Sequence, residues 1–213
     1  MSILHVPQVE VQVHNFDYHA LQQQLTGQEW HEIGHVNWPA EYPYKPKVAF
    51  QIVHNGSSIV LHYAVEEDYV KAQYIRPNEA VWEDSCVEFF LSLDNKETYY
   101  NIEFNVLGTG LIGYGPGVKS ERNRLTQEEI EQVSTATSVV QRSGAKKWNM
   151  IMVIPALVFN KQGDITLSGL RAFGNFYKCG DALPQPHFIS WSPIGHPTPN
   201  FHLPAFFGEL IFE

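Results

Sequence analysis

Short segments in which apolar and polar residues alternate recur along the chain. An alternation with period two is typical of β-strands that bury one face. Glycine, proline and asparagine separate these segments, and Asn55-Gly56 is a strong signal for a tight hairpin. We therefore predict strands at residues 9–13, 48–54, 58–65, 87–93, 99–106, 111–114, 137–141, 148–154, 165–173, 175–179, 188–191 and 208–212.

Signals for helices are few. Asp17 can cap a short helix that Gly27 ends. Thr126 and Glu129 have the spacing of a capping box, which predicts a second short helix. The chain shows no internal repeat and no linker that would divide it. The sequence therefore predicts one all-β domain over residues 1–213, an antiparallel β-sandwich with jelly-roll or immunoglobulin-like layers and one or two short helices.

Composition and charge exclude several classes of partner. With 213 residues and 44% hydrophobic content, the chain can form one well-packed core. It carries 14 Lys and Arg against 23 Asp and Glu, a net charge of −9, and so lacks the basic surface that nucleic-acid binding needs. No apolar run approaches the roughly 18 residues of a membrane span. We therefore expect neither a nucleic-acid nor a membrane partner.

The first residues also bear on localisation. Residues 1–13 contain neither the basic nor the apolar region of a signal peptide. We expect a cytoplasmic protein if this is the full-length chain, and a periplasmic or extracellular one if a leader was removed.

The two cysteines, Cys86 and Cys179, are too few for a disulfide framework, and we expect two free, buried thiols. The chain has ten histidines, but no Cys-x-x-Cys or His-x-x-x-His spacing suggests a zinc site.

The segments 87–93 and 99–106 predict a central hairpin with one apolar and one polar face. Alternation places Glu88 on the polar face of the first strand. On the second strand the polar face carries Asn101, Glu103 and Asn105. Matching the apolar faces fixes the parity of the register. One register that it allows sets Phe89 beside Phe104 and Glu88 beside Asn105.

Two tryptophans in polar surroundings indicate a binding site near this hairpin. Trp82 lies in Val81-Trp-Glu-Asp-Ser85, directly before the first strand, and Trp191 lies in Ser190-Trp-Ser-Pro-Ile194. Sugar rings have apolar faces that stack on indole and hydroxyl rims that need paired donors and acceptors. Glu and Asn side chains supply such pairs. Tyr114, in a glycine-rich turn, is a candidate for the rim of the same pocket, and His187 is a candidate lining residue.

At these residues the sequence resembles a family 9 carbohydrate-binding module of the stand-alone bacterial type. The matching segments are Val81-Trp-Glu-Asp-Ser-Cys-Val-Glu-Phe-Phe90, Tyr99-Tyr-Asn-Ile-Glu-Phe-Asn-Val-Leu-Gly108, Gly174-Asn-Phe-Tyr-Lys-Cys-Gly180, Ser190-Trp-Ser-Pro-Ile194 and Asn200-Phe-His-Leu-Pro-Ala-Phe-Phe-Gly208. The likeness extends from about residue 45 to the C-terminus. In the last of these segments the family pattern suggests that His202 is a structural clamp bonded to backbone.

The resemblance implies non-catalytic binding of a mono- or oligosaccharide, with one ring held between two tryptophans. Family members use a Trp, a Glu six residues later and a second Trp near the C-terminus, which fall here on Trp82, Glu88 and Trp191. The further candidate ligand contacts are Glu103, Asn105 and Tyr114. A role in carbohydrate catabolism or polysaccharide utilisation would follow.

Two other features of the family concern charge. Members carry structural calcium, for which Glu83 and Asp84 are the candidate ligands; no other cofactor is expected. A basic side chain that assists sugar binding in the family has no counterpart within residues 101–105, and Lys119, Arg122 and Arg124 are candidate substitutes.

Two alternatives remain open from the sequence alone. A glycosidase would need two carboxyl groups about 5–10 Å apart across a cleft, drawn from Glu83, Asp84, Glu88 and Glu103. A haem-binding sandwich would use a methionine such as Met150 or Met152, although the alternation of residues 148–154 favours ordinary core positions for both.

Overall fold

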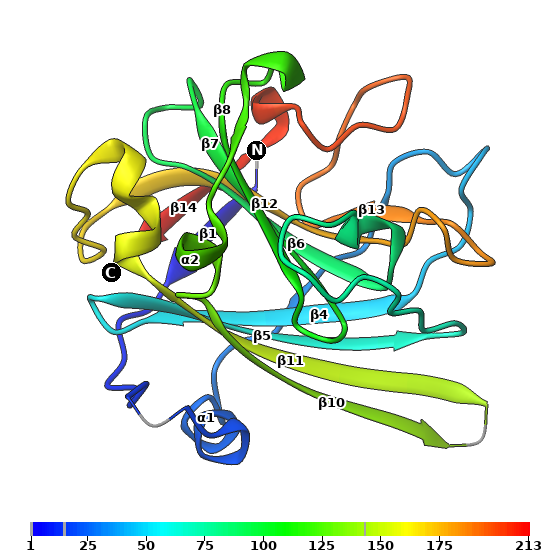
Figure 1. Cartoon of the computed structure of the whole chain (residues 1–213), viewed down its shortest axis with the longest axis horizontal. Coiled ribbons are helices and arrows are strands. Elements are labelled where there is room, and N and C mark those ends of the chain that lie inside the picture. The colour runs from blue at the N-terminus through cyan, green and yellow to red at the C-terminus, as the bar shows by residue number, and fades with distance from the viewer. Residues whose placement is uncertain (1, 15, 143) are drawn as a thin grey trace.

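A computed structural model of the chain describes residues 2–14, 16–142 and 144–213, and it shows a sandwich of two β-sheets (Figure 1). The larger sheet has the order β1-β14-β12-β6-β7-β8-β9, with β13 and β3 attached beside β12. Its strands are β1 (Ile3–Val6), β3 (His35–Val36), β6 (Cys86–Ser92), β7 (Tyr99–Asn105), β8 (Gly110–Gly115), β9 (Asn123–Arg124), β12 (Arg171–Cys179), β13 (Phe188–Ser190) and β14 (Gly208–Phe212). The pairing is antiparallel throughout except between β1 and β14.

The smaller sheet has the order β10-β11-β5-β4-β2 and is antiparallel. Its strands are β2 (His31–Glu32), β4 (Lys47–His54), β5 (Ser58–Glu67), β10 (Ser134–Arg142) and β11 (Ala145–Pro155). Asn55-Gly56 forms the predicted tight turn between β4 and β5, where Gly56 adopts a φ of 89° that favours glycine. The predicted all-β sandwich is therefore confirmed.

The described residues also contain six short helices. They are α1 (Tyr18–Gln24), η1 (Val81–Glu83), η2 (Lys119–Glu121), α2 (Gln127–Ile130), η3 (Ala156–Gln162) and η4 (Pro204–Phe206). Asp17 caps α1 through the backbone N–H of Ala20, and Thr126 and Glu129 form the predicted capping box of α2. Among the described residues, no helix combines the length and apolar character of a membrane span.

The main core lies between the sheets. It contains the inward-facing residues of the central hairpin together with β4, β5, β11 and β12, for example Phe89, Ile102, Phe50 and Phe176. Phe176 stacks on both Phe50 and Phe89, with ring centroids 3.9 and 4.7 Å away. A second apolar cluster lies on the outer face of the smaller sheet, beneath α1.

A third cluster lies on the outer face of the larger sheet. It includes Phe90, Tyr99 and Tyr177 from the strands and Phe201 and Phe207 from the C-terminal segment. Both strands of the central hairpin are therefore buried along their whole length. The polar residues that alternate with the core residues consequently lie under loops rather than in open solvent.

The structure corrects three predictions about elements. Residues 9–13 form no strand, because only the neighbouring Gln8 makes a bridge, to His54. Residues 165–170 form no strand, and a single strand, β12, begins only at Arg171. In the hairpin the predicted parity is right, but the register differs by two residues: Glu88 pairs with Glu103, and Phe89 with Ile102.

Candidate functional site

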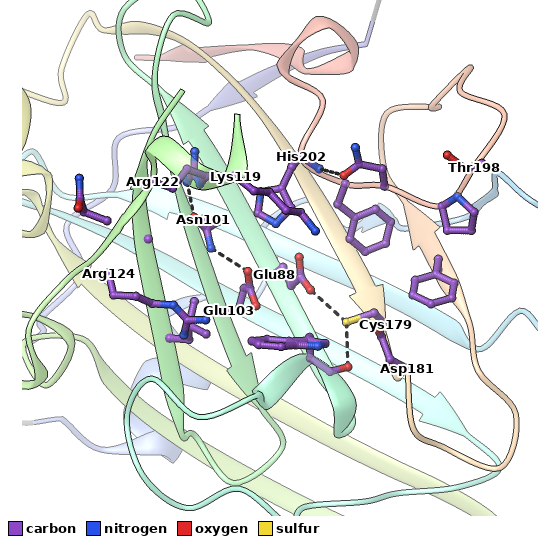
Figure 2. Close-up of a pocket in the computed structure, with 18 residues that line it drawn as sticks. Glu88, Asn101, Glu103, Lys119, Arg122, Arg124, Cys179, Asp181, Thr198 and His202 are labelled. Carbon is purple, nitrogen blue, oxygen red and sulfur yellow. Dashed lines mark hydrogen bonds between the residues drawn. The ribbon is translucent and has the colours of Figure 1, made fainter. Parts of the chain in front are cut away.

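A pocket of about 600 Å³ opens on the outer face of the larger sheet (Figure 2). The lining residues from the long central strands β6, β7, β8 and β12 are Glu88, Asn101, Glu103, Leu111, Gly113 and Cys179. Surrounding segments add Trp82, Lys119, Arg122, Asn123, Arg124, Asp181, Phe188, Thr198, Pro199, Asn200, Phe201 and His202. Strand alternation thus brings polar side chains to one face, and the loops around that face supply the aromatic ones.

Glu88 and Glu103 lie opposite each other across the β6–β7 ladder, and both line the pocket (Figure 2). Side chains in such a pair have Cβ atoms about 5 Å apart. Burial raises the pKa of Glu103 to about 7, and burial together with the charge of Glu103 raises the pKa of Glu88 well above its usual range. The pair therefore holds at least one proton at neutral pH and offers both a donor and acceptors.

One oxygen of each carboxyl group is held by a neighbouring side chain. Asn101 donates its Nδ2 proton to Oε1 of Glu103 over 2.8 Å. Cys179 donates its thiol proton to Oε1 of Glu88 over 3.0 Å. These bonds fix the orientation of both carboxyl groups at the base of the pocket.

Arg122 anchors the loop that forms one wall. Its guanidinium donates to the carbonyl oxygens of Gly115, Pro116 and Tyr99, at 2.6, 2.9 and 3.0 Å, and also to Oδ1 of Asn101. It also lies over the ring of Tyr99, 3.8 Å from the centroid. Four of its five N–H donors are therefore engaged by protein acceptors, which assigns the side chain a positioning role.

Lys119 and Arg124, the other two basic candidates, also line the pocket (Figure 2). Arg124 donates to the carbonyl oxygen of Asn78 over 3.0 Å and lies 5.6 Å from the centre of the Trp82 ring. The basic charges of the site thus come from the segment after β8 rather than from the central hairpin.

Trp82 belongs to η1, which is attached to the end of β12. Its carbonyl oxygen accepts the backbone N–H of Asp181 over 3.1 Å and lies 3.6 Å from Sγ of Cys179. The indole is partly exposed and lines the pocket. Of the predicted site residues, Trp82, Glu88 and Glu103 are therefore brought together.

The segment 198–202 supplies aromatic surface from the C-terminal part of the chain. Phe201 stacks on Tyr177 with ring centroids 4.1 Å apart. Nδ1 of His202 is 2.8 Å from the hydroxyl of Tyr99, and burial and the charge of Arg122 lower the pKa of His202 to about 3. His202 is therefore a neutral pocket-lining residue, and its side chain contacts a tyrosine rather than the backbone that we predicted.

Tyr114 and Trp191 lie outside the pocket. Tyr114 faces the sandwich interior, where its ring packs 4.6 Å from that of Tyr100 and its hydroxyl accepts from Thr98. Trp191 packs edge-on against Phe176 of the main core, with ring centroids 5.7 Å apart. The structure therefore does not place the two predicted tryptophans on either side of one ligand.

His187 is buried away from the pocket, with Nε2 2.7 Å from Nζ of Lys178. His187 therefore does not line the pocket as predicted. Its partner Lys178 precedes Cys179 on β12, so Lys178 faces the sandwich interior while Cys179 faces the pocket.

Asn105 shares the polar face of β7 but has a structural role. Its Nδ2 donates to Asp84 and to the carbonyl oxygen of Tyr74, and its Oδ1 accepts from the backbone of Leu107 and Thr109. The side chain is therefore occupied at the strand end, where it holds the segment before η1.

The surroundings of Asp84 do not fit a calcium ion. Its carboxylate is fully buried and accepts N–H groups of Gln73, Tyr74 and Asn105 at 2.9–3.0 Å, with Lys71 Nζ at 3.7 Å. These N–H donors already occupy the carboxylate oxygens that a calcium ion would need as ligands. Glu83 accepts the hydroxyl proton of Tyr74 instead. Calcium elsewhere in the chain stays a prediction.

Several pocket residues were absent from the predicted site. Asn101 could have been included, because alternation places it on the same face as Glu103. Phe201 and His202 lie in a segment with little regular structure, where no periodic pattern indicates their direction. Phe188 begins the short strand β13, whose three residues are too few to indicate a face.

A two-sheet sandwich with one polar, aromatic-lined pocket on its outer face is a ligand-binding module in its architecture. The sequence matches the model of Carbohydrate-binding family 9 over residues 17–212, and the chain belongs to this family. No curated protein matches the sequence.

Solved structures agree with this assignment. A "putative carbohydrate-binding protein" from Bacteroides uniformis ATCC 8492 is 43% identical, with a TM-score of 0.91 and coverage of 99% of both chains. A family 9 module from Caldicellulosiruptor kristjanssonii, in complex with glucose, is 11% identical with a TM-score of 0.60, over 100% of this chain and 96% of that one. A family 9 module from Caldicellulosiruptor kristjanssonii in complex with cellotriose is 11% identical with a TM-score of 0.62, over 100% of this chain and 94% of that one. The last two similarities concern the fold.

Proposed function

We propose that the pocket binds one ring of a mono- or oligosaccharide and does not cleave it. The observation that carries this proposal is the placement of Trp82 in the same cavity as the Glu88–Glu103 pair. A sugar ring needs apolar surface against its C–H groups and hydrogen-bonding groups around its rim, and this cavity offers both.

The pocket residues supply either aromatic surface or hydrogen bonds to the sugar. Trp82, Phe201 and His202 supply aromatic surface, and Phe201 and His202 take the place that we predicted for Trp191. The protonated and ionised members of the Glu88–Glu103 pair donate to and accept from hydroxyl groups, while Asn101 and Lys119 add further polar contacts. The volume of about 600 Å³ falls within the range of small-molecule sites, about 300–1,000 Å³.

The affinity should be weak. A single sugar has about 12 heavy atoms, and at roughly 0.3–0.4 kcal/mol each the binding free energy is about −4 to −5 kcal/mol, near millimolar affinity. Titrations must therefore reach concentrations well above the millimolar range.

The test is isothermal titration calorimetry or ligand-observed NMR with a panel that begins with glucose and cellotriose, the ligands of the two similar modules. Saturable binding of at least one neutral sugar, reduced in Glu88→Gln, is expected. An absence of binding across neutral, acidic and amino sugars would overturn the proposal.

A glycosidase is the second candidate, because Glu88 and Glu103 face each other with the separation of a cross-strand pair. It predicts turnover of an aryl glycoside that is lost in Glu88→Gln and Glu103→Gln. Sugar binding without turnover would support the binding module and contradict the enzyme. Met150 and Met152, the candidates for haem binding, both lie in the main core and give that alternative no support.

A further inference from the structure

Both cysteines of the chain meet at the base of the pocket. Cys86 and Cys179 are direct partners in the β6–β12 ladder, and Glu88 lies two residues along β6 on the same face. The two sulfur atoms and a carboxylate oxygen of Glu88 all lie within 4.8 Å of one another. Three potential metal ligands from two neighbouring strands therefore converge on one point.

The spacing suits a tetrahedral metal ion. Zinc binds thiolate sulfur at about 2.3 Å and carboxylate oxygen at about 2.0–2.2 Å, so its ligand atoms lie roughly 3.3–3.8 Å apart. Sγ of Cys179 lies 3.0 Å from Oε1 of Glu88, a hydrogen-bonded distance slightly shorter than this range. Because all three ligand atoms lie within 4.8 Å of one another, shifts of about 1 Å or less would bring them to the separations of a tetrahedral site. Two sulfur ligands favour zinc over calcium or magnesium, which prefer oxygen.

The charges around the cluster also favour a cation. Glu103 faces Glu88 across the ladder, and Asp181 lines the pocket two residues after Cys179. Lys178, the adjacent base on β12, contacts Glu67, with Nζ 2.8 Å from Oε2. The acidic cluster therefore gains no direct contact from Lys178. Lys119, Arg122 and Arg124 also line the pocket, but the two guanidinium groups donate to backbone carbonyl groups and to Asn101 rather than to Glu88, so a divalent ion would supply positive charge directly at Glu88.

We propose that Cys86, Cys179 and Glu88 form a zinc site beneath the sugar pocket. Glu88 and Cys179 line the cavity, so the fourth coordination position faces the pocket and takes a water molecule or a ligand oxygen. Zinc binding is measured without sugar, so the zinc site can be present or absent whether or not the proposed function is correct.

The test uses the whole chain, reduced and stripped of metal with a chelator. Cadmium is the optical probe, because its bond to thiolate gives an ultraviolet charge-transfer band, and zinc affinity is measured by competition with a chromophoric chelator. Burial raises the pKa of the Cys86 thiol to about 12, so the titration is run above neutral pH, where protons are more readily displaced. One equivalent of metal per chain is expected.

Single replacements identify the ligands. Cys86→Ser and Cys179→Ser should each weaken zinc binding by more than about tenfold, because loss of a direct ligand exceeds the effect of an outer-shell change. Glu88→Gln should weaken zinc binding but keep the thiolate band. Glu103→Gln is the matched control, since it removes an equal charge from the same pocket and no ligand; its effect should be smaller than that of Glu88→Gln.

A second measurement requires no variant. In the native protein, zinc should slow alkylation of both thiols by iodoacetamide, and removal of the zinc should reverse this protection. The proposal is overturned if the reduced native chain shows neither the band nor the protection, or if the double variant Cys86→Ser/Cys179→Ser binds zinc as tightly as the native chain.

Discussion

The indole of Trp191 lies over Gly208, where a Cβ atom would come within 2.5 Å of Cζ3 of the ring and 2.8 Å of the carbonyl oxygen of Ser2. This close approach joins the C-terminal strand, the N-terminal strand and the tryptophan. It explains why Trp191 has a structural role, although its sequence context resembles that of Trp82.

Gly208→Ala should therefore destabilise the protein by about 1–3 kcal/mol, because the added methyl group displaces either the indole or the backbone. Gly195→Ala is the control, since its Cβ would meet its nearest neighbour at 3.5 Å, an ordinary contact, and we expect a change of less than about 1 kcal/mol. Urea unfolding of both variants measures the difference. Equal stabilities would contradict the packing role of Trp191.

Whether the role of a single residue could be predicted from the sequence has a physical cause. Trp82, Glu88 and Glu103 could be predicted because they lie on or directly before one strongly alternating hairpin. Tyr114 is misplaced from the sequence because its strand is short: alternation puts it on the face opposite Gly113, and only the structure shows that Gly113 faces the pocket. Trp191 could not be excluded, because only its tertiary contact with Gly208 distinguishes it from a binding residue.

Between elements, alternation fixes which face a residue occupies but leaves the register open. The β6–β7 register depends on the turn, where both oxygens of Asp94 accept the backbone N–H of Thr98 and Ser92 accepts the backbone N–H of Lys96. These bonds set the pairing of Glu88 with Glu103. The same limit applies to the two cysteines, which share no local motif and meet only through the β6–β12 pairing.

A buried ion pair links the two sheets. Lys178 of β12 is fully buried and lies 2.8 Å from Glu67 of β5, whose other oxygen accepts the indole N–H of Trp148 on β11. Removing one partner leaves an uncompensated charge in the interior, which is more costly than replacing both.

Lys178→Met should therefore reduce the free energy of unfolding by about 3–5 kcal/mol. The double variant Lys178→Met/Glu67→Gln should lose less than the single one, because the neutral amide can still accept from Trp148. Chemical unfolding of the native chain and both variants measures these free energies of unfolding. A double variant at least as unstable as Lys178→Met would show that the charges do not depend on each other.

The stability of the whole molecule should depend on pH through groups with opposite effects. Burial and the charge of Lys178 lower the pKa of His187 to about 3, below its usual value of 6.5. The unfolded chain then binds more protons between pH 6.5 and 3, so His187 makes the fold less stable as pH falls through this window. Glu103, whose pKa is raised to about 7 from 4.5, acts in the opposite direction between pH 7 and 4.5.

His187→Asn isolates the histidine contribution. The stability advantage of the native chain over this variant should shrink as pH falls from 6.5 towards 3, because only the native chain must keep His187 unprotonated next to Lys178. Urea unfolding at a series of pH values measures this gap, and His35→Asn, at an exposed position, controls for the loss of one histidine. A gap that stays constant with pH would show that His187 does not titrate as described.

The central claim for the whole molecule is that the sugar binds in the pocket that contains Trp82 and not at Trp191. The most direct measurement is calorimetric titration of the native chain, Trp82→Ala and Trp191→Ala with a sugar that the native chain binds, at a temperature at which circular dichroism shows all three to be folded. Trp82→Ala should lose about 1–3 kcal/mol of binding free energy from the missing apolar contact. Trp191→Ala should bind like the native chain. Unchanged binding by Trp82→Ala, or loss of binding only in Trp191→Ala, would contradict the account.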